Sequence, residues 1–225
     1  MTTWGLIGSG HIGSTVARLA VAAGHDVVLS NRRGPETLQD LVSELGPHAR
    51  AGTTDEAAAD ADIVVVTIPL RSYQQVPADA LAGKVVVDTM NYYPQRDGAI
   101  AELDDGSTTS SELLQAHAPS ARVVKGFNNI YFGHLASLAR PHGADDRTAL
   151  PIAGDDEAAK QQVAQALDEI GYDTVDVGPL AEGWRTQPGT PAYGTPYALD
   201  PEAWNEGGRT VPADEVRQHV AAARR

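Results

Sequence analysis

The feature that most constrains the fold is a short glycine pattern near the N-terminus. Gly8-Ser9-Gly10-His11-Ile12-Gly13 follows the apolar run Trp4-Gly5-Leu6-Ile7, and apolar residues recur at helical spacing directly after it. Glycines spaced in this way permit a tight turn, a close approach of phosphate to the backbone, and close packing of helix on strand. The pattern therefore predicts a strand, turn and helix that bind a dinucleotide pyrophosphate through all six loop residues.

Short apolar runs and amphipathic stretches alternate along the rest of the chain. Residues 63–66 and 85–87 are apolar without alternation, which is typical of strands buried on both faces of a parallel sheet. The expected strands are 4–7, 26–30, 49–51, 62–69, 84–88, 122–127, 149–153 and 172–177. The expected helices are 11–23 (closed by Gly24), 35–45, 55–59 (capped by Thr54), 110–118, 157–170 and 213–223.

This alternation predicts an α/β fold, a Rossmann-type doubly wound and mostly parallel sheet with a small C-terminal extension domain. The pattern breaks near residues 140–146, where Pro141, Gly143 and several charged residues interrupt it. We therefore expect a dinucleotide-binding Rossmann domain over residues 1–140 and a small α+β domain over residues 141–225.

Composition excludes several classes of function. The chain has 30 acidic and 17 basic residues and a net charge of −13, so a nucleic acid would be repelled. It has no cysteine and no metal-type spacing among its histidines, so we expect neither a disulfide scaffold nor a metal site. Without a signal-type or membrane-spanning segment, the expected location is the cytoplasm and the expected partner is a small-molecule substrate.

The residues after the second expected strand indicate which dinucleotide binds. An NAD site carries a carboxylate there for the ribose hydroxyls, whereas this chain has Ser30-Asn31-Arg32-Arg33. Guanidinium groups would form charge-assisted hydrogen bonds with a 2′-phosphate, and Ser30 and Asn31 can add neutral ones. These four residues therefore favour NADP(H). The alternative is that Arg32 and Arg33 are solvated charges before a helix.

Five segments carry a family resemblance. They are residues 5–13, the arginine pair after Ser30-Asn31, Thr67-Ile68-Pro69, Asp88-Thr89-Met90-Asn91 and residues 124–130. In this order they resemble the NADPH-dependent coenzyme F420 reductases, also called F420:NADP oxidoreductases, over residues 1–140. They are similar as well to the cytosolic domain of the STEAP metalloreductases.

The resemblance implies hydride transfer between NADP(H) and a deazaflavin or flavin acceptor, and coenzyme F420 is the acceptor that it favours. Thr67, Ile68 and Pro69 would border the ribose and nicotinamide, while Asn91, Phe127 and Asn128 would lie at the mouth of the cleft. Hydride transfer between two rings needs alignment more than an acid–base residue, so no catalytic side chain is assigned. A homodimer is a further expectation.

Several readings stay open at this point. The enzyme could instead reduce a small carbonyl or imine, or the protein could sense NADP(H) without turnover. Lys125 could place charge near an anionic substrate or simply end a strand. Trp184, Tyr193 and Tyr197 could form an aromatic wall for a flat ring, a small core or a dimer contact.

Overall fold

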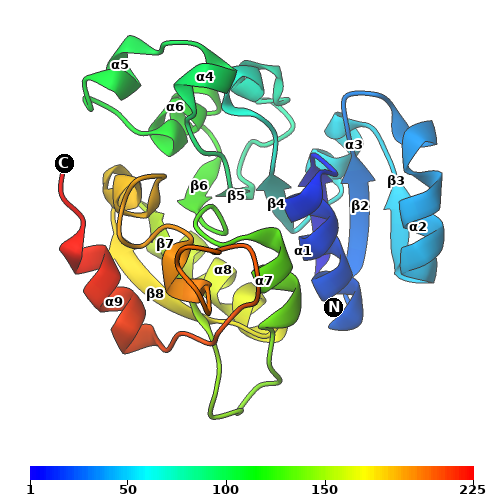
Figure 1. The fold of residues 1–225 in the computed structure, drawn as a ribbon. Coiled ribbons are helices and arrows are strands. Elements are labelled where there is room, and N and C mark those ends of the chain that lie inside the picture. The colour runs from blue at the N-terminus through cyan, green and yellow to red at the C-terminus, as the bar shows by residue number, and fades with distance from the viewer.

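The computed structural model describes all residues from Met1 to Arg225, and its centre is one sheet of eight strands (Figure 1). The strands are ordered β3-β2-β1-β4-β5-β6-β7-β8, and every neighbouring pair is parallel except β6 and β7. Their bounds are β1 Thr3–Ile7, β2 Asp26–Ser30, β3 Ala49–Ala51, β4 Ile63–Val66, β5 Val85–Asp88, β6 Arg122–Lys125, β7 Ala149–Gly154 and β8 Asp173–Gly178. The predicted doubly wound, mostly parallel α/β fold is confirmed.

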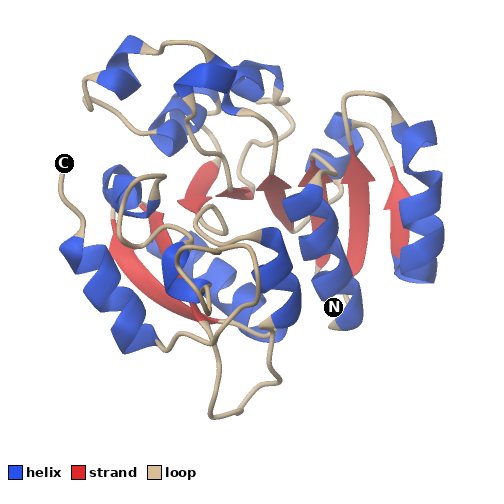
Figure 2. Ribbon diagram, viewed as in Figure 1, coloured by secondary structure: helices blue, strands red, loops and turns tan.

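Helices cover both faces of this sheet (Figure 2). The α-helices are α1 His11–Ala22, α2 Gln39–Leu45, α3 Thr54–Ala59, α4 Pro94–Asp97, α5 Ala101–Asp104, α6 Ser110–His117, α7 Phe132–Ser137, α8 Glu157–Glu169 and α9 Ala213–Ala222. Short 3-10 helices are η1 Pro35–Leu38, η2 Gly46–His48, η3 Leu70–Gln75, η4 Leu180–Thr186 and η5 Thr195–Tyr197. None of these helices combines the length and the hydropathy needed to cross a bilayer.

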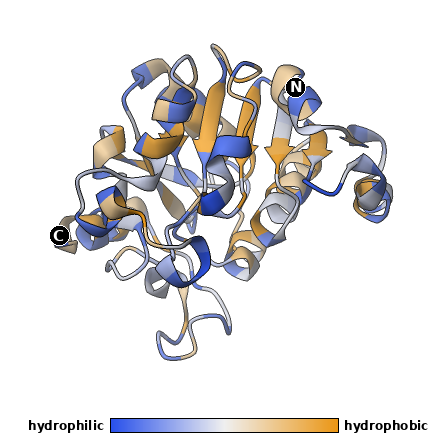
Figure 3. Ribbon diagram, turned by 90° about the horizontal axis from the view of Figure 1, so that it is seen from above, coloured by the Kyte–Doolittle hydropathy of each residue, from blue (hydrophilic) through white to orange (hydrophobic).

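Burial on both faces explains the apolar strand sequences. Ile63 and Val65 of β4 join the core under α1, α2, α7, α8 and α9, whereas Val64 and Val66 join the core under α3, η3 and α6. Successive strand residues point to opposite faces, so a strand covered twice has no polar side. In Figure 3 the central strands are accordingly among the most hydrophobic parts of the ribbon.

The strand order places the site. The chain runs outward from β1 through β2 to β3, then returns to β4 on the other side of β1. Ligands bind at such a reversal, beyond the carboxyl ends of the strands. The loops after β1, β2, β4, β5 and β6 meet at this edge, which is where the candidate residues occur.

Some sequence predictions were wrong in detail. The cap of α3 is Thr53 and not Thr54, because the Thr53 hydroxyl accepts from the Glu56 amide while the Glu56 carboxylate accepts from the Thr53 amide. Strand β4 ends at Val66, before Thr67-Ile68-Pro69 turns away into η3. Helix α7 and the short α4 and α5 were not predicted.

The C-terminal part extends the same sheet. Strands β7 and β8 follow β6 in the sheet, and Val175 of β8 and Val216 of α9 share one apolar core with Val16 of α1. The antiparallel step from β6 to β7 is where the second part of the chain joins the first. The division into domains at residue 140 stays a prediction.

Candidate functional site

Two of the three motif glycines are required by the fold itself. Gly8 has a φ of +112°, and a Cβ there would lie 2.3 Å from the Thr67 carbonyl oxygen. A Cβ on Gly13 would lie 2.1 Å from the Gly8 carbonyl oxygen. Any side chain at either position would push the turn and α1 away from the loop after β4. These glycines therefore fix the shape of the turn.

Gly10 differs, because nothing in the protein occupies the space that its side chain would take. No heavy atom lies within 4 Å of a Cβ built there. Gly10 is also the N-cap of α1, and no side chain caps this end of the helix. The first amides of a helix have no partner within it and attract anions. An open backbone concavity at an uncapped helix N-terminus is the geometry that fits a pyrophosphate.

A cavity of about 430 Å³ opens on one side of this loop, beyond β2. Arg32 lines it, and its guanidinium makes no hydrogen bond or ion pair with the protein. Arg33 is exposed and does not line the cavity. The remaining lining residues are Ile7, Gly8, Asn31, Gly34, Pro35, Thr53, Thr54, Ile68, Pro69, Arg71, Ser72, Gln75 and Val76.

The neighbouring polar residues have structural roles. Ser30 is fully buried, and its hydroxyl donates to the Leu6 carbonyl at 2.8 Å, so it joins β2 to β1 instead of facing a ligand as expected. The Asn31 side chain accepts from the Arg33 amide at 2.7 Å and donates to Thr37 at 2.9 Å and Ser9 at 3.3 Å. Asn31 thus shapes the loop that presents Arg32, and it also lines the cavity.

A second cleft, of about 490 Å³, lies on the other side of the loop. Ile68 and Pro69 border both cavities, and Gly10 lies at the start of the second. His11 stacks on Phe132 with ring centroids 4.2 Å apart. The cleft brings together residues from six segments of the chain: Gly10, His11, Ile12, Thr67, Ile68, Pro69, Thr89, Met90, Asn91, Tyr93, Arg96, Phe127, Asn128, Asn129, Ile130, Tyr131, Phe132, Tyr193, Gly194 and Trp204.

Two amides hold the floor of this cleft together. The Asn91 side chain donates to the Asn128 carbonyl at 2.7 Å, and the Asn128 side chain donates to the Asn91 side-chain oxygen at 3.1 Å. Asn128 also donates to the Thr186 carbonyl at 2.8 Å, and the Thr186 hydroxyl donates back to it. Both residues line the cleft, and their hydrogen bonds position β5, β6 and the C-terminal segment.

The backbone at the end of β6 makes this arrangement possible. Phe127 is buried with a φ of +58°, the one non-glycine residue of the chain in the left-handed region. Such a conformation costs about 1–3 kcal/mol and persists where the surroundings enforce it. The turn sends Asn128 toward Asn91 and Asn129 toward the Ala192 carbonyl at 2.8 Å. The C-terminal segment is thereby held over the cleft.

Lys125 has a structural role. It is 1% exposed, and its ammonium contacts Asp88 at 3.1 Å, Ser110 at 3.0 Å and the Met90 carbonyl. Burial lowers the pKa of Lys125, although the Asp88 charge acts in the opposite direction. Of the two interpretations that the sequence left open, the structure supports the one in which Lys125 ends a strand, because its ammonium is buried among protein partners and the residue does not line the cleft.

The comparisons with known proteins agree with this geometry. Residues 3–92 match the family model described as NADP oxidoreductase, coenzyme F420-dependent. A solved structure of a hypothetical protein from Sinorhizobium meliloti superimposes with a TM-score of 0.72 and 31% identity, over 84% of this chain and 91% of that one. The F420-dependent NADP reductase of Methanothermobacter thermautotrophicus is 25% identical over 77% of this chain and 79% of its own length.

Over residues 3–92 the chain is thus similar to the coenzyme F420-dependent NADP oxidoreductases. The family resemblance expected from the sequence is confirmed, and the matched family model and the matched reductase are both described as NADP oxidoreductases. Metalloreductase STEAP3 of Rattus norvegicus is also similar, with 28% identity over 79% of this chain, but the match spans only 34% of that protein's length. The family model covers the phosphate loop, the arginine pair and Asn91, and it ends before Phe127 and Asn128.

Sequence reasoning missed most of the outer wall of the cleft. Tyr93, Tyr131 and Trp204 line it but lie in three separate segments without a shared motif. Of the three aromatics considered from sequence, Tyr193 lines the cleft, Tyr197 is buried in the core and Trp184 lies under Arg185 and Arg225. Arg71, opposite the arginine pair, was missed as well.

Proposed function

We propose that the protein transfers a hydride between NADP(H) and a flavin-type ring, with the deazaflavin coenzyme F420 as the first acceptor to test. The observation that carries the proposal is the pair of cavities on either side of the phosphate loop, which share Ile68 and Pro69. One cavity contains an unpaired arginine and the other is lined by aromatic rings. This arrangement suits an extended dinucleotide whose two ends need different surroundings.

In this proposal the chain's residues bind and orient. The amides of Gly10, His11 and Ile12 would hold the pyrophosphate, and Arg32 would hold the 2′-phosphate. Thr67, Ile68 and Pro69 would border the ribose and the nicotinamide. Bound NADPH would supply the hydride. The remaining candidate cofactor residues are Gly8, Ser9, Gly13, Asn31, Arg33, Asn91, Phe127 and Asn128, whereas the buried Ser30 supports the strand below them.

The polar groups of the acceptor cleft support ring-to-ring transfer. The amides of Asn91 and Asn128 bond to each other, and the Arg96 guanidinium bonds to Asp97 and to the Asn91 carbonyl. No carboxylate or lysine lines the cleft. A hydride transfer between stacked rings depends on distance and alignment more than on an acid or a base in the cleft.

One observation favours the reduction of a small carbonyl or imine as a second candidate. The hydroxyls of Tyr93 and Tyr193 lie 2.5 Å apart in the cleft and could provide a proton. However, burial and the bond to Tyr93 raise the pKa of Tyr193, which makes it a poor acid near neutral pH. The flavin-type acceptor is therefore preferred.

An anaerobic assay of NADPH oxidation with F420, FMN, FAD and riboflavin in parallel tests the proposal. We expect turnover with at least one of these rings and a higher rate with NADPH than with NADH. Turnover only with small carbonyls or imines would replace the proposal by its alternative. Cofactor binding without oxidation by any acceptor would indicate an NADP(H) sensor. A mass measurement in solution would test the homodimer that we propose in addition.

A further inference from the structure

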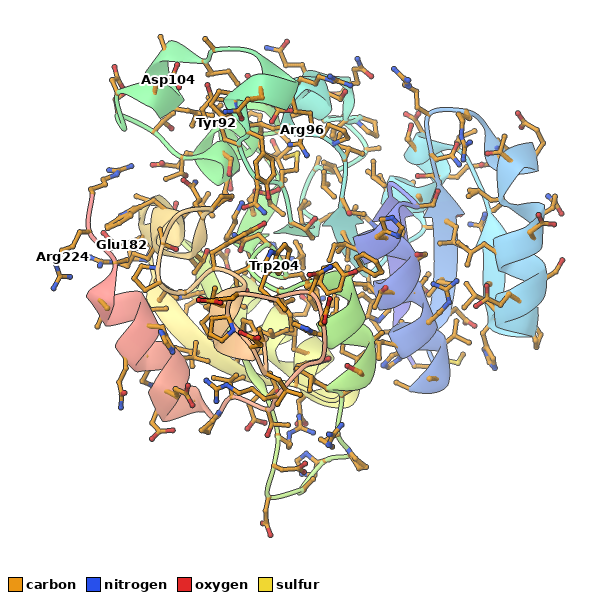
Figure 4. The ribbon with its side chains drawn as sticks, viewed as in Figure 1. Tyr92, Arg96, Asp104, Glu182, Trp204 and Arg224 are labelled. Carbon is orange, nitrogen blue, oxygen red and sulfur yellow. The ribbon has the colours of Figure 1, made fainter.

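The loop at residues 199–207 carries an aromatic side chain to the cleft from outside the sheet. Its two ends are joined by the Ala198–Gly208 bridge and by a bond from the Leu199 amide to the Gly207 carbonyl at 3.1 Å. Trp204 lies near the middle of this loop and lines the cleft. We call residues 199–207 the Trp204 loop. Figure 4 shows Trp204 between the side of α7 and the segment that carries Arg96.

Trp204 is exposed in a way that a purely structural tryptophan is not. Its side chain is 40% exposed, and apart from Met1 only Leu199, on the same loop, is a more exposed large apolar residue. The indole and the Tyr131 ring are almost perpendicular, with their ring centroids 5.3 Å apart. A Cβ built on Gly194 would lie 3.6 Å from the indole, an ordinary van der Waals distance, so the backbone at Gly194 lies beside the ring. The indole is thus held at the lip of the cleft.

The charges around this lip are unfavourable for an anionic ligand. Asp200, Glu202 and Glu206 are exposed on the Trp204 loop itself. Arg96 is the only lysine or arginine lining the cleft, and it is already bonded to Asp97 and to the Asn91 carbonyl. The chain as a whole carries a net charge of −13. A phosphate or carboxylate tail leaving the cleft at this point would meet like charges and no free cation.

We propose that Trp204 selects the acceptor by contact with a flat heteroaromatic ring, and that the protein does not recognise the acceptor's anionic tail. This inference rests on the proposed function and specifies its acceptor side. Ring contact of this kind uses the π-face and the apolar area of the indole, and every flavin-type ring offers both. Affinity should then depend on the ring and hardly on whether a phosphate is attached.

Kinetics at saturating NADPH test the role of Trp204. We expect Trp204→Ala to raise the KM for riboflavin and for FMN alike, by about tenfold, with the KM for NADPH unchanged. Trp204→Phe should retain most of the affinity, and Trp184→Phe, which alters a tryptophan outside the cleft, should have no effect. An unchanged acceptor KM in a folded Trp204→Ala protein would overturn the proposal.

A comparison of riboflavin with FMN tests whether the protein recognises the anionic tail of the acceptor. The KM for FMN should equal that for riboflavin or exceed it by up to about threefold, because exposed carboxylates repel the phosphate, and added salt should reduce the difference. Replacing Glu202 with lysine should make FMN the better acceptor, because a cation then faces the phosphate. A preference of the unmodified protein for FMN over riboflavin of more than about tenfold, lost at high salt, would contradict the proposal.

Tryptophan fluorescence separates this inference from the proposed function. In a Trp184→Phe background, riboflavin should quench the emission, and the additional Trp204→Phe substitution should remove the part of the quenching that requires contact, because Trp4 is buried in the core. Quenching that depends on Trp204 without any turnover would leave the inference standing and reject hydride transfer to flavins. Turnover that does not change when Trp204 is replaced would support hydride transfer and reject the role of Trp204. If neither Trp204-dependent quenching nor turnover is observed, both proposals are rejected.

Discussion

The two cavities of this protein are built from different kinds of sequence. The cofactor cavity takes its walls from residues 7–76, and its phosphate loop is six consecutive residues. The acceptor cleft draws on residues from Gly10 to Trp204, held by bonds such as Asn128 to Thr186 and Asn129 to Ala192. A local motif fixes the first, and long-range contacts assemble the second. A substitution at one backbone position should therefore be enough to abolish binding in the cofactor cavity. The acceptor cleft should instead be lost when the long-range contacts that support it are removed.

The largest effect should come from Gly10. Gly10→Val should abolish measurable NADPH binding, because the new side chain would fill space left open for the pyrophosphate, and should cost only about 1 kcal/mol as an N-cap change. Calorimetric titration and a thermal melt measure the two effects. Gly13→Val is the matched control, since its Cβ meets the Gly8 carbonyl and should destabilise the fold. Retained binding in Gly10→Val would mean that the phosphates lie elsewhere.

The next effect concerns the support of the acceptor cleft. Lys125→Met leaves the Asp88 carboxylate buried without its cation and should lower the free energy of unfolding by about 3–5 kcal/mol. Chemical denaturation measures this change. The double variant with Asp88→Asn should recover much of the loss, because neither buried charge then remains. Equal stability of the single variant and the unmodified protein would show that the pair does not hold β5 to β6.

The arginine pair offers a narrower test within the cofactor cavity. Arg32→Ala should weaken NADPH binding by about 10–100-fold and NADH binding hardly at all, because only NADPH carries the 2′-phosphate. Arg33→Ala is the matched control and should have a smaller effect, since Arg33 does not line the cavity. Dissociation constants for both cofactors decide the matter. Equal losses of affinity for NADPH and NADH in the variant that combines Arg32→Ala with Arg33→Ala would contradict the assignment of these arginines to the 2′-phosphate.

The smallest expected effect is a pH dependence at the acceptor end. His134 is buried beside Tyr131 and next to Gly208, and burial lowers its pKa more than the Gly207 backbone raises it. A histidine whose folded pKa is lowered binds a proton more weakly when folded, so its contribution to stability is present above the ordinary pKa, near 6.5, and is lost as the pH falls below it.

Thermal melts between pH 7.5 and pH 5 of the unmodified protein and of His134→Leu measure this contribution. We expect the unmodified protein to lose more stability on acidification than the variant. The acceptor KM should rise at low pH more than the KM for NADPH, because His134 packs under the end of the Trp204 loop. Parallel pH profiles for both proteins would remove His134 as the cause.

The same contrast explains what the sequence could predict. Strands β2 and β3 were predicted to the residue, and α1, α8 and α9 to within one residue, because periodicity and terminal signals are local. Helix α7 was missed because it has only six residues, one of them Gly133, too few for a periodicity to appear. The place of Tyr193 in the cleft and of Tyr197 in the core depends on bonds to Asn129, 63 to 68 residues away, which no local pattern reveals.

The spacing of the lining residues along the chain also has a consequence for biosynthesis. Every residue that borders the cofactor cavity has been synthesised once Val76 is in place, whereas the acceptor cleft is incomplete until Trp204 has followed. A nascent chain therefore contains every residue that lines the cofactor cavity before it contains those that complete the acceptor cleft. Termination before Trp204 would remove one wall of the acceptor cleft together with α9, whose Val216 and Val220 belong to the shared core.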